Sequence, residues 1–93
     1  MTLEKINLIC DAIKETKDII KTQAESIYSR DLVDVLFRLP YCKIKFLVDA
    51  NIAKEKTASK YLKDLDAIGL LEKVKVGREN LYINKKFFDI LRS

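Results

Sequence analysis

The chain has 93 residues, of which 48% are hydrophobic, with two glycines, one proline and a formal net charge of +4. This length supports one domain, and the composition is that of a folded globular protein rather than a disordered or fibrous one. The chain has no histidine, and so lacks the commonest general base and the commonest metal ligand. It also has no glycine-rich phosphate loop. The sequence therefore argues against an enzyme and predicts no metal and no cofactor.

The location of the protein is read from what the sequence lacks. No apolar run approaches the roughly 20 residues that span a bilayer, and the charged N-terminal segment has no apolar signal-peptide core. We therefore expect a cytoplasmic protein that does not enter a membrane. Cys10 and Cys42 are far apart in the sequence and show no CxxC spacing. In a reducing compartment we expect both to be buried apolar residues.

The first predicted element is a long helix from Thr2 to Ala24, with Thr2 as its N-cap. Apolar residues recur along it at alternating intervals of three and four, as in a heptad seam, which Lys17 interrupts. Residues 29–93, which number 65, can cover only part of this seam, so the seam either packs along its own domain or pairs with another helix. We favour contact with a second copy or a neighbouring domain. The candidate contact residues are Leu3, Ile6, Cys10, Ile13 and Ile20.

The second predicted helix runs from Arg30 to about Arg38. Ser29 precedes it as an N-cap, and Pro40 ends it because the residue before a proline avoids the helical region. Tyr41 and Cys42 are predicted to be a simple connector to the next helix. We accordingly divide the chain into a linking or dimerisation helix, residues 1–28, and a second unit, residues 29–93.

The third predicted helix, from Lys43 to about Ala50, is followed by a tight turn over residues 51–53. Asn51 tolerates the left-handed conformation that such a turn needs. A longer helix then runs from about Lys54 to Ile68, and Gly69 stands where a helix end favours a left-handed residue. The apolar residues of this longer helix recur at helical spacing and define one buried face. They are Ala58, Leu62 and Leu65, flanked by Tyr61 and Ile68.

Alternating residues then predict a two-stranded ribbon. Val74 and Val76 alternate with lysines, and Gly77–Asn80 is predicted to form the hairpin turn. Residues 81–84 form the return strand, and Lys85–Arg92 forms a short closing helix. This order of helices and strands predicts a mainly α fold with a small β-hairpin. We interpret it as a winged helix-turn-helix preceded by a long N-terminal helix.

Positive charge gathers late in the chain. Residues 43–69 carry six lysines against four acids, and residues 70–93 carry six basic residues against three acids. In a winged helix these are the recognition helix and the wing, which predicts binding to double-stranded DNA. The candidate contact residues are Lys43, Lys56, Thr57, Ser59, Lys60, Lys63, Lys73, Lys75 and Arg78. The longer helix also carries Glu55, Asp64 and Asp66 and lacks arginine, asparagine and glutamine, so it has few groups for bidentate base reading.

Three segments resemble the C-terminal region of Fic-family proteins. They are IYSRDLVDVLF, LPYCKIKFLVDANIAKEKTASKYLKDLDAIGLL and VGRENLYIN, and the lead-in TLEKINLICDAIKETKDIIK is similar to the helix that joins the Fic core to that region. The catalytic domain of that family transfers AMP from ATP to protein hydroxyls. Its HPFxxGNGR-like signature is absent, so no catalytic residue carries over. The resemblance implies a winged-helix appendage of a Fic-type AMP transferase.

An alternative function remains open beside DNA binding. The seam of the first helix would dock on a Fic catalytic domain or on a second copy, making the chain a protein-interaction or oligomerisation module that regulates an AMP transferase. Tyr41, Phe46 and Tyr82 would serve as anchors if they are exposed, although core packing is the more common role of such residues.

Overall fold

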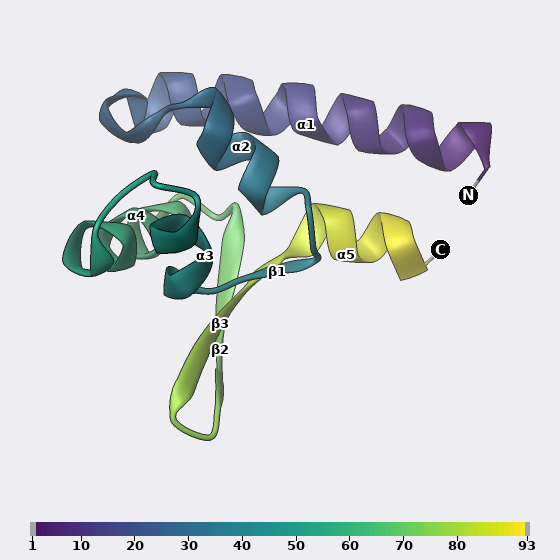
Figure 1. The fold of residues 1–93 in the computed structure, drawn as a ribbon. Helices are drawn as coiled ribbons and strands as arrows, with labels where there is room; N and C mark the ends of the chain where they lie inside the picture. Colours follow the sequence, from purple (N-terminus) through teal and green to yellow (C-terminus); the bar gives the residue numbers. More distant parts are fainter. Residues whose placement is uncertain (1, 93) are drawn as a thin grey trace.

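The structure, a computed structural model, describes residues 2–92 (Figure 1). The bounds of the predicted units at Met1 and Ser93 lie outside the described residues. The helices are α1 (Leu3–Gln23), a short 3-10 helix η1 (Glu25–Ile27), α2 (Arg30–Leu36), α3 (Ile44–Asp49), α4 (Glu55–Ala67) and α5 (Lys85–Arg92). The strands are β1 (Tyr41–Cys42), β2 (Leu71–Val76) and β3 (Glu79–Asn84). The mainly α winged helix-turn-helix with a long leading helix is confirmed.

The helix α1 lies across one side of the molecule and packs on α2 and α5 (Figure 1). Thr2 caps it, since its hydroxyl oxygen accepts a hydrogen bond from the Lys5 amide at 3.3 Å. Its buried positions follow at intervals of four, which places them on one face. These positions are Ala12, Thr16 and Ile20. Because Ile20 is fully buried in the common core, the second half of α1 is part of the same packed body as the winged unit.

The helix ends confirm the sequence signals. Ser29 caps α2, because its hydroxyl accepts from the Leu32 amide at 3.0 Å. Asn51 has a φ of 58° between α3 and α4, and Gly69 has a φ of 87° after α4. Lys54, at the N-cap of α4, makes no capping hydrogen bond with its side chain. The turn that joins α3 to α4 is therefore set by the backbone of Asn51.

The sheet has one strand more than the ribbon predicted from the sequence. Tyr41 and Cys42, predicted as a connector, form β1, which pairs with Ile83 and Tyr82 of β3 in an antiparallel sheet of order β1–β3–β2. A strand of two residues is too short to show the alternation of apolar and polar side chains that predicts a strand. It forms because β3 lies beside it. The connector prediction was wrong.

The hairpin turn is tighter than predicted. Val76 pairs with Glu79, which leaves Gly77 and Arg78 alone in the loop. Gly77 has a φ of 62° and Arg78 does not have a positive φ, which is the pattern of a type II′ turn. Asn80, predicted within the turn, is already in β3. This turn suits the right-handed twist of a two-stranded ribbon.

Asn84, whose side chain is buried, links three parts of the fold through its side chain and its backbone amide. Its amide nitrogen donates to the carbonyl of Leu36 at 2.9 Å, and its side-chain oxygen accepts from the Phe87 amide at 3.3 Å. Its own backbone amide donates to the carbonyl of Pro40 at 3.0 Å. The end of α2, the approach to β1 and the start of α5 are thus held together at the last residue of β3.

The two cysteines differ, contrary to the expectation that both are buried. Cys42 is buried and Cys10 is exposed on α1. The seam position of Cys10 turns away from the core because the buried face of α1 follows Ala12 and Thr16 instead. Burial raises the pKa of the Cys42 thiol to about 12, so this side chain remains a neutral thiol.

None of the helices within residues 2–92 combines the length and apolar character needed to cross a bilayer.

Replacing Asn84 by alanine tests its linking role. The change leaves the Leu36 carbonyl and the Phe87 amide buried without their partner, and each such group costs about 1–3 kcal/mol. We expect the free energy of unfolding, measured by urea denaturation, to fall by about 2 kcal/mol or more. Asn80→Ala, in the same strand, is the matched control, for which we expect a change within about 0.5 kcal/mol. Equal losses in the two variants would contradict the role given to Asn84.

Thiol labelling tests the difference between the cysteines. With dithionitrobenzoate at about pH 8, we expect Cys10 to react at once and Cys42 only after unfolding. In the unfolded chain the pKa of the Cys42 thiol is near its ordinary value of 9.0, whereas in the folded chain burial raises this pKa to about 12. The stability contributed by Cys42 is therefore complete below about pH 9 and declines as the pH rises above it. Prompt labelling of both thiols in the folded protein would show that Cys42 is not buried.

Candidate nucleic-acid interface

The register of the hairpin places two wing lysines on the helix-facing side of the sheet. Directly paired residues of antiparallel strands project to the same face. Lys73 pairs with Tyr82, and Leu71 pairs with Asn84. Leu71, Tyr82 and Asn84 are all buried, so their face is the one that packs on the helices. Because side chains alternate along a strand, Lys73 and Lys75 project to this face and Val74 projects to the other.

The helix α4 presents its basic residues away from the core. Ala58, Leu62 and Leu65 are fully buried. Lys56, Lys60 and Lys63 are exposed, and their spacing of four and three residues places them in one stripe along the helix. Thr57 is also exposed, and Ser59 is half-buried.

The wing carries the rest of the basic surface. Lys73, Lys75 and Arg78 are exposed. Figure 1 shows the β2–β3 hairpin projecting beyond the helices, away from the layer formed by α1. Arg78 stands in the two-residue loop at its tip. The helix α4 packs against β2, so the lysine stripe and the wing lysines stand on neighbouring elements.

Ion pairing distinguishes Lys43 from the other basic candidates. Its ammonium lies 3.0 Å from a carboxylate oxygen of Glu79, and the Lys43 side chain is 31% exposed. Within residues 2–92 the other ion pair joins Lys86 of α5 to Glu15 of α1. The basic residues of α4 and of the wing loop therefore face solvent without an acidic partner, whereas Lys43 shares its charge with the wing.

The acids of α4 moderate this positive surface. Glu55 is exposed in the first turn, and Asp64 and Asp66 are half-buried. Burial, together with the negative charge of Asp66, raises the pKa of the Tyr82 phenol. Tyr82 is buried and therefore unavailable as a surface anchor.

The seam residues of α1 divide into two groups. Ile20 is fully buried and Ile13 packs partly against the core. Leu3 is 73% exposed and Ile6 is 44% exposed, and Cys10 is exposed beside them. Only the first half of the seam is therefore available to another molecule.

The described residues contain no cluster of three or more histidine, cysteine, aspartate or glutamate side chains arranged for a metal.

Residues 12–87 match the sequence profile described as the C-terminal domain of SoFic-like protein adenylyltransferases. The chain belongs to this family. The resemblance to the C-terminal region of Fic proteins is thereby confirmed. The SoFic-like domain is an appendage of the adenylyltransferases and not their catalytic domain.

Proposed function

We propose that this SoFic-like C-terminal domain binds double-stranded DNA through α4 and the wing. The observation that carries the proposal is that two groups of exposed basic residues stand on neighbouring elements. The stripe of Lys56, Lys60 and Lys63 lies on α4 and the helix-facing lysines lie on β2, against which α4 packs, and no acidic side chain pairs with them in the described chain. In a winged helix this arrangement suits a helix in the major groove and a wing on the adjacent backbone.

The composition of this surface supports phosphate contacts more than base reading. Six exposed basic residues, Lys56, Lys60, Lys63, Lys73, Lys75 and Arg78, are placed to neutralise phosphates. If all six do so, the logarithm of the binding constant falls with the logarithm of salt concentration with a slope of about −5. Arg78, at the tip of the wing, is suited to a narrow minor groove, whose negative potential attracts arginine.

A fluorescence-anisotropy titration with a random-sequence duplex, at low and near-physiological salt, tests the proposal. We expect salt-sensitive binding that Lys60→Glu and Arg78→Glu each weaken at least tenfold, because each change removes a phosphate contact and adds repulsion. The two variants place DNA on the helix and on the wing separately.

Lys85→Glu is the matched control. Lys85 is an exposed lysine at the start of α5, on a different element from the lysine stripe and the wing, and its replacement makes the same change in net charge. We expect a much smaller loss of affinity in this variant. Equal losses of affinity in all three variants would show that the net charge of the protein, and not the position of the charge, determines binding. The absence of duplex binding at low salt would refute the DNA proposal.

A second function is favoured by the apolar surface at the start of α1. Leu3 and Ile6, three residues apart on one face of α1, are 73% and 44% exposed, and large apolar side chains grouped on a surface are typical of interaction sites. This surface would contact a second copy of the chain or the catalytic domain of an adenylyltransferase. The domain would then regulate the enzyme by holding it in a defined assembly.

Light scattering over a range of concentrations tests the version with two copies. We expect wild-type chains to associate as concentration rises, and Leu3→Glu with Ile6→Glu to remain monomeric, because a charge at each position opposes burial. Thr22→Glu, exposed near the other end of the same helix, is the control and should behave as wild type. Monomers at every concentration in all three proteins would leave only the catalytic domain as the partner of this surface.

A further inference from the structure

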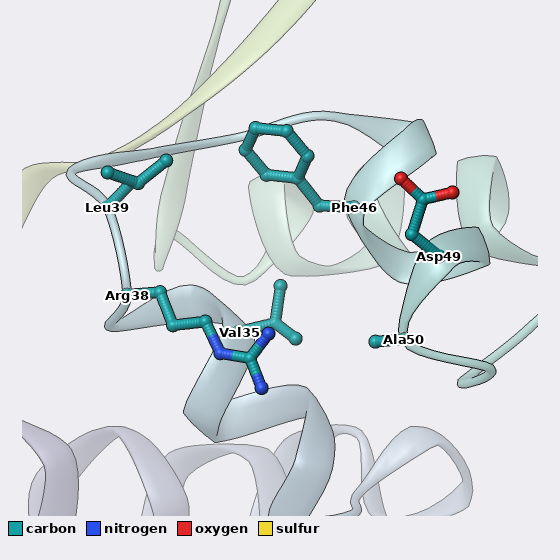
Figure 2. Close-up of a pocket in the computed structure, with 6 residues that line it drawn as sticks. All are labelled: Val35, Arg38, Leu39, Phe46, Asp49 and Ala50. Atoms are coloured by element: carbon teal, nitrogen blue, oxygen red, sulfur yellow. The ribbon is translucent and has the colours of Figure 1, made fainter.

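A cavity of about 290 Å³ opens between the C-terminal end of α2 and α3 (Figure 2). Its lining residues are Val35, Arg38, Leu39, Phe46, Asp49 and Ala50. Its volume is close to the lower end, about 300 Å³, of the range of ligand pockets. The cavity can therefore hold one large side chain or a small molecule.

The walls of the cavity are apolar between two opposite charges. Val35 is buried, and Leu39 is 41% exposed although it is a large apolar residue. Phe46 is half-buried, and its ring is held by Tyr41, with the ring centroids 5.8 Å apart. Leu39 and Phe46 thus offer apolar surface that the domain itself leaves partly uncovered.

The charges stand on opposite sides of the cavity. Figure 2 shows Arg38 in the turn that follows α2 and Asp49 on α3 across the cavity from it. Both residues are exposed. In the part of the chain that the structure describes, neither side chain makes an ion pair or a hydrogen bond. A guanidinium and a carboxylate beside an apolar cavity are therefore available to a ligand.

The cavity continues along α3 toward the wing. A second hollow of about 420 Å³ shares Phe46 and Asp49 with the first and reaches Glu79 and Asn80 of β3. It exists because β1 ends at Cys42, so the start of β3 has no strand beside it on that side within residues 2–92. The two hollows adjoin at Phe46 and Asp49 along the surface of α3, and we call them together the α3 trough.

The α3 trough is distinct from the surface proposed to bind DNA. The helix α3 packs on α4 and buries Leu47 completely, whereas Phe46 and Asp49 line the trough. Of the nine candidate DNA-contacting residues, Lys43 alone lines the trough, and its ammonium is already paired with Glu79. The trough can therefore be occupied independently of α4 and the wing lysines.

We propose that the α3 trough binds an extended peptide segment of a partner protein. The segment places an apolar side chain between Leu39 and Phe46, an acidic residue beside Arg38 and a basic residue beside Asp49. Charge complementarity sets this order, since a guanidinium pairs well with a carboxylate and leaves the opposite wall for a cation. A trough that continues past its deepest cavity suits an extended chain, and an apolar anchor in a pocket is the usual centre of such an interface.

Selection of a phage-displayed random peptide library on the full chain tests the proposal. We expect enriched peptides to share an apolar residue with an acid on one side and a base on the other. Measured by fluorescence anisotropy, the best peptide should bind the double variant Arg38→Asp/Asp49→Arg at least tenfold more weakly. A peptide with its two charges exchanged should regain most of the affinity. Both replaced side chains are exposed, so folding should be kept, which circular dichroism checks.

Asp89→Arg/Arg92→Asp, the same exchange on exposed residues of α5, is the matched control and should bind like wild type. Failure to enrich the pattern, or equal binding to wild type and the Arg38/Asp49 variant, would overturn the proposal. The proposal would also be overturned if no peptide were selected and the Arg38/Asp49 variant lost duplex binding, because the trough would then be part of a nucleic-acid surface. Retained duplex binding beside lost peptide binding would support both proposals separately.

Discussion

The arrangement of this domain depends on one buried amide side chain. Asn84 donates to the Leu36 carbonyl and accepts from the Phe87 amide, so a single residue satisfies backbone groups at the end of α2 and the start of α5. Buried backbone groups are costly when unpaired, and few side chains both donate and accept as an amide does. The position of α5, and with it the support for the first half of α1, therefore rests on the last residue of the wing.

The wing follows from the same junction. Because Tyr82 and Asn84 turn toward the core, Lys73, which pairs with Tyr82, projects to the helix side and Val74 projects to the outside. Hydrophobicity alone would favour burial of Val74 and Val76, but the structure buries Tyr82 and Asn84 instead and leaves both valines exposed. Lys73 and Lys75 therefore project to the side of the sheet on which the helices pack.

The domain thus presents separate surfaces on a small core. The basic surface of α4 and the wing suits a duplex, and the α3 trough suits a polypeptide. Membership of the SoFic-like C-terminal family makes both relevant to an adenylyltransferase. A domain that binds DNA on one surface and a protein segment on another would place the enzyme and its target together, without contributing a catalytic group.

The five α-helices, the caps Thr2 and Ser29 and the family could all be predicted from the sequence alone. Ser29, Asn51 and Gly69 specify local backbone geometry, and local rules are written in consecutive residues. Only the tertiary structure decided that Tyr41 and Cys42 form a strand, that Cys10 is exposed, and that Phe46 and Asp49 face a trough. Each of these depends on contacts with residues tens of positions away. Such pairings leave no periodic signal in a short segment, because they form only when the chain has folded.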